Sequence, residues 1–188
     1  HLTILGLKEW IPDSGCGDIA RACVLQLNSD IYHTIHSQGP NCAVIATHPF
    51  PHFFIGDLTG WPGGGLWRAM PFDLVGGTVD ALDILCYSHK PPPEGTEHNV
   101  TALNAGVRLP PSAGSDAIMG TGASKPLGGY RVYVDLDGAP LTMENWINGL
   151  VGGHSFVTNY PLITHFEVQG ARPGETAAQH GQIITGSV

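Results

Sequence analysis

The chain has 188 residues, 42% of them hydrophobic, which is typical of a single folded domain with one sizeable core. Eight basic residues stand against 16 acidic ones, giving a formal net charge of -8 without any lysine or arginine cluster, and this argues against a nucleic-acid partner. No stretch approaches the roughly 18 consecutive apolar residues of a membrane-spanning helix.

The N-terminal part predicts a strand, a turn-rich loop and a helix. Residues 2–7 form a short apolar strand, and residues 29–38 have the pattern of a helix. Ser and Asp near its start offer N-caps, Ile31 and Ile35 share one face, and Gly39 ends it. His33 and His36 lie away from the isoleucine stripe, so they are predicted to face solvent.

The next strand, residues 43–47, is apolar without polar alternation and stops at His48 and Pro49. Such a strand is usually covered on both faces, and its carboxyl end then lies at the rim where α/β folds carry their chemistry. Two interpretations of His48 stay open from this stretch alone. It is either a functional group at the rim or a histidine that hydrogen-bonds backbone where the strand ends.

The middle of the chain continues the alternation of strands and helices. Residues 56–71 are rich in glycine and proline and predict a long surface loop, residues 78–88 a strand, and residues 96–106 a short helix. Residues 109–117 predict another strand that ends in Gly-Ser-Asp. The order favours a parallel α/β sheet or barrel.

The pattern changes after residue 125. Residues 128–138 alternate like a half-exposed strand, Thr142 caps a predicted helix, and residues 162–170 and 181–188 look like antiparallel strands with glycine turns. We therefore expect residues 125–188 to form a small β-rich appendage.

Cysteine and histidine give weaker signals. The four cysteines have no CxxC spacing; Cys42 and Cys86 are predicted to be buried thiols, whereas Cys16 and Cys23 could pair in an oxidising compartment. Ten histidines outnumber the eight lysines and arginines, and imidazole is the commonest metal ligand.

Three candidate metal ligands stand next to predicted strands. These are His1 before the first strand, His48 after the second, and Asp116 at the end of a later one. Two imidazoles and a carboxylate suit a divalent cation such as zinc, manganese or iron. Strand ends of a barrel converge on one mouth, so the three would meet there.

Four stretches carry a family resemblance. They are "HLTILGLKE", "DIYHTIHSQGPNCAVIATHP", "ALNAGVRLPPSAGSDA" and "WINGLVGGHSFVTNYPLITHFEVQG". In this order they resemble the polymerase-and-histidinol-phosphatase (PHP) metallohydrolases, in particular the CehA/McbA-like branch. The resemblance covers most of the chain.

The resemblance implies a PHP-type, distorted TIM-like β/α barrel, with residues 1–124 as its C-terminal half. It matches His1, His48 and Asp116 to metal ligands of the family. It also implies a hydrolase that cleaves an ester, amide, carbamate or phosphoester bond of a small-molecule substrate with a metal-bound hydroxide.

The departures from the family pattern are equally specific. The first half of the family pattern contains a His-x-His strand, an Asp-His pair and a bridging glutamate, and it has no counterpart in this sequence. We therefore expect an N-terminal half or another chain to complete the barrel. A homo-oligomer is an open alternative. Ala117 and Ile118 follow the aspartate where many members have a second histidine. Tyr160 replaces a usual glycine.

The residues proposed to bind substrate are His52, Arg68, Arg108 and Asn159. No side chain is predicted to be catalytic. Arg108 is expected to be partly buried against a carboxylate, because an unpaired buried guanidinium is costly. A surface position is the alternative for this arginine.

A second function class also stays open. A non-catalytic binding or assembly protein could retain a PHP scaffold after losing part of the metal site, since a fold does not guarantee an activity. Cytoplasmic and secreted or periplasmic locations both remain compatible with the sequence; a low content of lysine and arginine and an even number of cysteines motivate the extracellular alternative.

Overall fold

The computed structural model describes residues 2–11, 28–47, 70–85, 99–100, 102–115, 117, 126–160, 162–177 and 186–187. Its elements in chain order are β1 (Leu2–Leu5), α1 (Asn28–His36), β2 (Ala43–Ala46), α2 (Met70–Val75), β3 (Ala81–Leu85), β4 (Pro111–Ala113), β5 (Arg131–Val134), α4 (Met143–Val151), β6 (Ser155–Thr158), β7 (Glu167–Val168) and β8 (Gly186–Ser187). Residues 99–100 and 102–104 are also helical.

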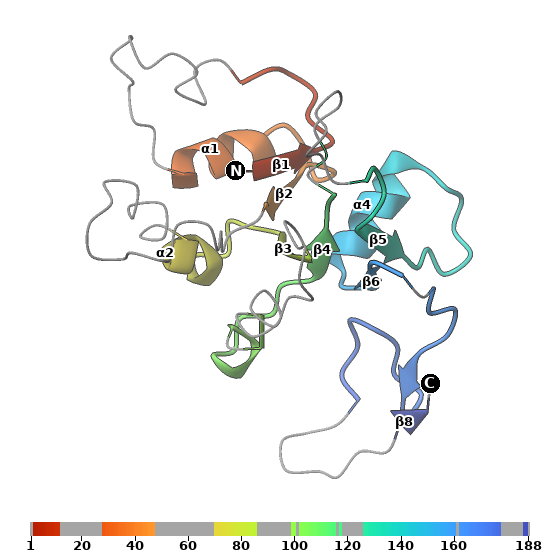
Figure 1. Cartoon of the computed structure of the whole chain (residues 1–188). Coiled ribbons are helices and arrows are strands. Elements are labelled where there is room, and N and C mark those ends of the chain that lie inside the picture. The colour runs from red at the N-terminus through yellow and green to blue at the C-terminus, as the bar shows by residue number, and fades with distance from the viewer. Residues whose placement is uncertain are drawn as a thin grey trace.

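The largest sheet has four strands in the order β1-β2-β3-β4 (Figure 1). β2, β3 and β4 are parallel, as the sequence predicts, whereas β1 runs antiparallel to β2. An antiparallel edge strand on an otherwise parallel sheet is common in α/β proteins. The expectation of parallel strands is therefore wrong for β1, while closure of the sheet into a PHP-type barrel stays a prediction.

One face of this sheet is covered by α1. Ile31, Tyr32 and Ile35 on the helix are buried in one cluster with Val44 on β2 and Leu82 on β3. The isoleucine stripe predicted from the sequence is confirmed, and Tyr32, which is fully buried, extends it. This helix face packs its apolar side chains on that side of the sheet.

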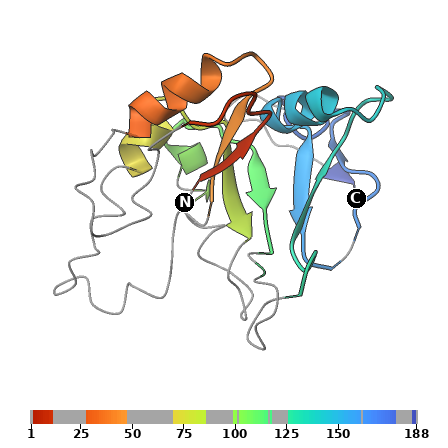
Figure 2. The ribbon, with the colours of Figure 1, turned by 90° about the horizontal axis from the view of Figure 1, so that it is seen from above.

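The opposite face is covered by elements that follow residue 125. Leu150 on α4 is buried together with Ile45 on β2 and Ala81 on β3. Val132 and Val134 on β5 pack around them. Figure 2 shows α4 and β5 alongside the four-stranded sheet. The proposed appendage therefore shares a hydrophobic cluster with the sheet, and a division of the chain near residue 124 remains a prediction.

Two small antiparallel sheets complete the described fold. β5 pairs with β6, and in that pair the rings of Tyr133 and Phe156 stack with their centroids 5.3 Å apart. The sequence did not predict β6 as a strand. β7 pairs with β8, which confirms the antiparallel strands predicted at the C-terminal end.

The helix ends follow the sequence signals in part. Thr142 caps α4 as predicted, because its side chain accepts a hydrogen bond of 3.1 Å from the backbone N–H of Asn145. α1 begins at Asn28, one residue before the predicted start, and ends at His36. α2 was not predicted, and its first two residues fall within the segment expected to be loop.

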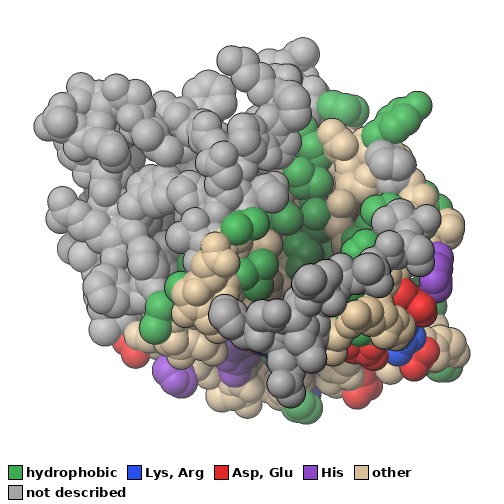
Figure 3. Space-filling model, turned by 90° about the horizontal axis from the view of Figure 1, so that it is seen from below, with side chains coloured by type: hydrophobic (Ala, Val, Ile, Leu, Met, Phe, Trp, Pro, Cys, Tyr) green, Lys and Arg blue, Asp and Glu red, His purple; other side chains and the backbone are tan. Residues whose placement is uncertain are grey.

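On the face shown in Figure 3, hydrophobic side chains of the described part gather near the centre, and charged and other polar side chains lie below them. Trp10, Leu141 and Tyr160 are the most exposed of the large hydrophobic side chains, each more than four-fifths accessible. Among the described residues, no helix has both the length and the apolar character needed to cross a membrane.

Candidate functional site

One end of the main sheet, where the parallel strands terminate, brings together the ends of all four strands. We call this end of the sheet the sheet edge. The parallel strands β2, β3 and β4 all have their carboxyl ends at this edge. Because β1 is antiparallel and Leu2 pairs with Ala46, the amino end of β1 lies at the same edge. Figure 2 shows the arrowheads of β3 and β4 pointing to the side of the sheet where β1 begins.

The predicted metal ligands His1, His48 and Asp116 lie outside the described residues. Their described neighbours in the chain are Leu2, Thr47 and Ser115. Leu2 is the first residue of β1, Thr47 follows the last residue of β2, and Ser115 comes two residues after β4. All three neighbours therefore belong to the same edge.

Polar side chains line up across one face of the sheet near this edge. We call Thr3, Thr47, Asp83 and Ser112 the polar row. Strand pairing places Thr3 opposite Ile45 and Asp83 opposite Ser112. Since side chains two residues apart on a strand share a face, all four lie on the face that also carries Ile45 and Ala81.

The polar row is partly held together by its own hydrogen bonds. The hydroxyl oxygens of Thr3 and Thr47 lie 2.6 Å apart and share a hydrogen bond between β1 and the end of β2. Ser112 and Asp83 are almost fully buried, with 2% and 6% of their surface exposed. Buried hydroxyl and carboxyl groups are retained in a protein interior where they bind polar partners or cations.

Asp83 is the functional candidate that the sequence analysis did not identify. Its carboxylate points toward the Gly-Ser-Asp turn, since Oδ2 lies 3.9 Å from the position that a Cβ on Gly114 would take. The available signal was an acidic residue inside the apolar stretch "ALDIL", because a charged group there must be buried together with its neighbours.

The turn after β4 is fixed by contacts to the C-terminal part of the chain. The Ser115 hydroxyl donates to the backbone oxygen of Tyr130 and accepts from its backbone N–H, both at 3.4 Å. The Ser155 hydroxyl donates to the backbone oxygen of Pro111 at 3.2 Å. β4 and its turn are thus supported by the residues next to β5 and by β6.

The described histidines lie elsewhere. The His33 side chain is exposed, as predicted, and its Nδ1 lies 2.6 Å from the backbone oxygen of Ser29. The prediction that His36 faces solvent is wrong, because its Nε2 lies 2.8 Å from Oδ2 of Asp80 and its side chain is only 34% exposed. The same Asp80 oxygen accepts a 2.7 Å hydrogen bond from the backbone N–H of Val44, so this pair anchors α1 to the start of β2.

No cluster of three or more His, Cys, Asp or Glu side chains suitable for a metal occurs within the part of the chain that the structure describes. Cys42 is a free and buried thiol, as predicted, and its Sγ donates to the backbone oxygen of Gly6 at 3.3 Å. The predictions for Cys16, Cys23 and Cys86 lie outside the described residues.

Two of the four predicted substrate-binding residues are described. Asn159 is exposed directly after β6. Arg108 is exposed, so the expectation of burial is wrong; it lies in the irregular segment between a helix end at Gly106 and β4, which leaves the guanidinium open to solvent. No described carboxylate forms an ion pair with it. His52 and Arg68 lie outside the described residues.

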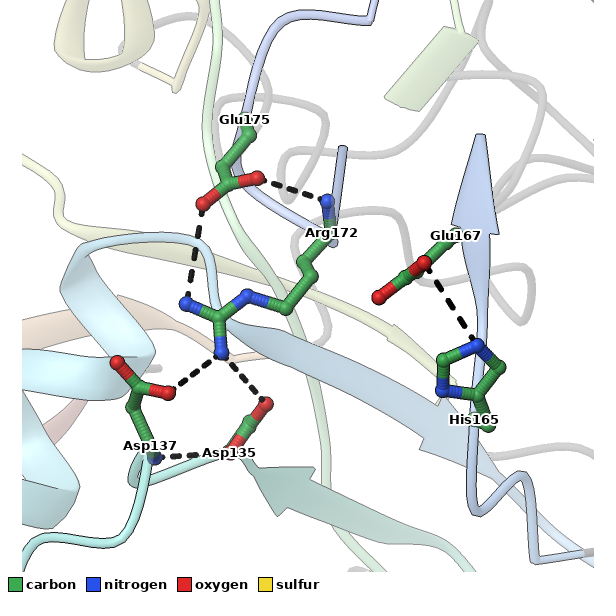
Figure 4. A network of polar contacts seen from close by, with 6 residues as sticks. All are labelled: Asp135, Asp137, His165, Glu167, Arg172 and Glu175. Carbon is green, nitrogen blue, oxygen red and sulfur yellow. Dashed lines mark hydrogen bonds and ion pairs between the residues drawn. The ribbon is translucent and has the colours of Figure 1, made fainter. Parts of the chain in front are cut away.

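A second polar cluster surrounds Arg172 (Figure 4). Its guanidinium Nη1 lies 2.7 Å from Asp137 and 3.6 Å from Asp135, and Nη2 lies 3.8 Å from Glu175. The hydrogen bond from Arg172, and then its positive charge, lower the pKa of the Asp137 carboxyl. These exposed contacts join the turn after β5 to the segment after β7, which is a structural role.

Comparisons of the chain with protein-family models, with curated proteins and with solved structures found no match. Sequence motifs and the geometry of the sheet edge therefore carry the functional interpretation.

Proposed function

We propose that the protein is a metal-dependent hydrolase that cleaves an ester, amide, carbamate or phosphoester bond in a small-molecule substrate. The observation that carries the proposal is the direction of β1. Its antiparallel pairing brings Leu2 to the edge where Thr47 and Ser115 also lie, and these residues adjoin the three ligands expected from the sequence. A parallel β1 would have carried Leu2 to the opposite edge.

In this proposal His1, His48 and Asp116 hold a divalent cation, zinc, manganese or iron. Imidazole nitrogen and carboxylate oxygen are suitable donors for these metals. When bound, the cation would supply Lewis-acid chemistry: it lowers the pKa of a water molecule and polarises the substrate bond.

The described residues prepare the site in two ways. The hydrogen bond between Thr3 and Thr47 joins β1 to the residue after β2, and these two threonines are close in sequence to His1 and His48. Ser115, which precedes Asp116 in the sequence, is held by its contacts with the backbone of Tyr130. Ligands held by such supporting contacts bind a metal more tightly, because less conformational freedom is lost on binding.

Metal analysis of the complete protein, purified without chelator, tests the proposal. We expect bound transition metal, a loss of hydrolysis of an activated ester or carbamate after chelation, and recovery when the metal is restored. Protein that holds no transition metal, and whose hydrolytic activity is unmoved by adding one, would refute the hydrolase. A binding or assembly protein on the same scaffold would then be the better account.

A further inference from the structure

Residues 162–177, which we call the strap, contain no buried side chain. Their regular structure is β7, which pairs with β8 over two residues. Large apolar side chains of the strap remain open to solvent, among them Leu162 and Phe166, which are 57% and 41% exposed. Figure 1 shows β8 and the blue chain beside it below β6, away from the four-stranded sheet. With so little apolar burial, the position of the strap depends on its polar and backbone contacts.

The polar contacts of the strap with the preceding chain all involve Arg172, as far as the described residues show. Its Nη1 lies 2.7 Å from Asp137 and 3.6 Å from Asp135, both in the turn after β5 (Figure 4). Within the strap, Glu175 accepts a 2.9 Å hydrogen bond from the Arg172 backbone N–H and so orients the arginine. The Asp135 and Asp137 side chains are 56% and 75% exposed, so salt screens these contacts.

A second contact joins two glycines. Gly153, in the turn between α4 and β6, and Gly174, in the strap, have φ of +81° and +88°. A Cβ on Gly174 would lie 2.7 Å from the backbone oxygen of Gly152, and a Cβ on Gly153 would lie 3.1 Å from Cα of Gly174. These neighbours are backbone atoms, which cannot turn aside as a flexible side chain can. Only glycine therefore lets the strap approach this turn so closely.

Both contacts lie at one end of the β5–β6 pair. These strands are antiparallel, so the turn after β5 and the chain entering β6 are neighbours, and the Asp135 backbone N–H donates to the His154 backbone oxygen at 2.8 Å. The next residue, Ser155, donates to the backbone oxygen of Pro111, the first residue of β4. The strap is thus held near the amino end of β4, which is the end opposite the sheet edge.

We propose that the strap opens and closes on the rest of the protein as one piece, and that the Arg172 ion pairs and the contact between Gly153 and Gly174 hold it closed. Opening breaks exposed contacts and exposes no buried side chain of the strap, so it costs far less than global unfolding. The strap keeps its own shape when it opens, because Val168 and Ala171 exchange two backbone hydrogen bonds of 2.9 and 3.0 Å. Its motion needs no metal and does not depend on the proposed function.

The first experiment compares Gly174→Ala with Gly170→Ala by backbone ¹⁵N relaxation of the full chain. Both glycines belong to the strap and have positive φ, +88° and +78°, but no atom of the described residues lies within 4 Å of a Cβ at position 170. Gly174→Ala places its Cβ against the backbone of Gly152 and should release the strap. The order parameters of the β7 amides should then fall from about 0.85 to below about 0.6, while those of β5 stay high. Gly170→Ala should keep the wild-type values.

The second experiment tests the ion pairs. In Arg172→Met the ratio of open to closed strap should rise about twofold to fivefold, the range expected for the loss of exposed ion pairs. The amide shift of Gly153 measures this ratio, with Gly174→Ala as the open reference. Arg131→Met removes an exposed arginine of β5 outside the strap and should leave the ratio unchanged. Raising the salt concentration to about 1 M should open the wild-type strap in the same direction, because the Debye length falls to about 3 Å.

Each other outcome overturns the proposal. Rigid β7 amides in Gly174→Ala would mean that the glycine contact does not hold the strap, and an equal fall in Gly170→Ala would assign the effect to backbone strain alone. Mobile β7 amides in the wild type at low salt would mean that the strap is not closed. If the variants do not fold, the wild type decides: a Gly153 amide shift and β7 order parameters that salt leaves unchanged would contradict a strap held by Arg172.

Discussion

Tyr32 is the largest fully buried side chain of the described part, so its removal should cost much stability. It is fully buried on the inner face of α1, and among the described residues its hydroxyl makes a long hydrogen bond of 3.5 Å to Asp73. Most of its contribution therefore comes from the buried ring. Tyr32→Ala should lower the free energy of unfolding by about 3–5 kcal/mol, the usual cost of losing a large core side chain. Tyr32→Phe should lower it by about 1 kcal/mol. Urea denaturation measures both, and equal losses would contradict this division.

The same residue predicts a pH dependence. Burial, followed by the nearby Asp73 carboxylate, raises the pKa of Tyr32 above its ordinary value of 10.0. The unfolded chain then loses this proton at a lower pH than the folded protein does. The stabilisation is complete below pH 10 and is lost as the pH rises through the folded pKa. Stability above pH 10 should fall less steeply in Tyr32→Phe than in the wild type, as alkaline denaturation would show.

Arg172 should control the titration of Asp137. The arginine lowers the pKa of this carboxyl, so the folded state gains stability above the ordinary aspartate range and loses it as the pH falls through the lowered pKa. In Arg172→Met the Asp137 pKa should rise toward its ordinary value. Carboxyl carbon shifts in NMR measure it, and an unchanged pKa would mean that the contact in Figure 4 has no effect in solution.

At the scale of single residues, local patterns in the sequence predicted which side chains are buried. They could not predict contacts between residues that are far apart in the sequence. The stripe of Ile31 and Ile35 and the thiol of Cys42 follow from apolar spacing within a few residues. The partner of His36 is Asp80, 44 residues away, and no local pattern connects them. The exposure of Arg108 likewise depends on the path of an irregular segment.

The connection after β1 should tolerate no side chain at its glycine. Gly6 has φ +69°, and a Cβ there would lie 2.0 Å from the backbone oxygen of Asn41. Gly77 has nearly the same φ, +67°, and no atom of the described residues lies within 4 Å of the added Cβ. Gly77→Ala should therefore cost only the left-handed backbone strain, about 1–2 kcal/mol, whereas Gly6→Ala should cost clearly more. If the two variants lower the melting temperature equally, the backbone at Gly6 is not as close to Asn41 as described.

The N-cap of α4 offers a second test at the scale of elements. Thr142→Ala removes the acceptor for the Asn145 backbone N–H and should destabilise the protein by about 0.5–2 kcal/mol. Thr142→Ser keeps a hydroxyl and should retain most of the stability. If alanine and serine behave alike in chemical denaturation, the hydroxyl is not the stabilising group.

Most elements could be predicted from the sequence, but their pairing could not. The apolar runs gave β1 to β4, and a threonine cap with a glycine end gave α4. The direction of β1 depends on the connection through residues 6–42, whose length allows either orientation. β6 has only four residues and follows a glycine pair, so its alternation was too short to recognise.

For the whole molecule, the sheet edge is the place where described strand ends adjoin the motif residues expected to bind metal. The strands β1 to β4 form this edge. The polar row lies on one face of the sheet near it, and the sequence neighbours of three expected ligands lie beside it. The PHP-type barrel and its completion by an N-terminal half or another chain remain predictions. The substrate-binding roles of His52, Arg68, Arg108 and Asn159 remain predictions as well.

Metal titration of the complete protein, with and without the double substitution His48→Ala and Asp116→Ala, tests the central claim most directly. Both residues are expected at a strand-end rim and not in the packed core, so the variant should keep its circular dichroism spectrum while losing metal binding. The control is His33→Ala with Asp30→Ala, which removes the same residue types from the exposed side of α1 and should bind metal like the wild type. A folded double variant that retains full metal affinity, or one that unfolds with its metal affinity unchanged, would contradict the account.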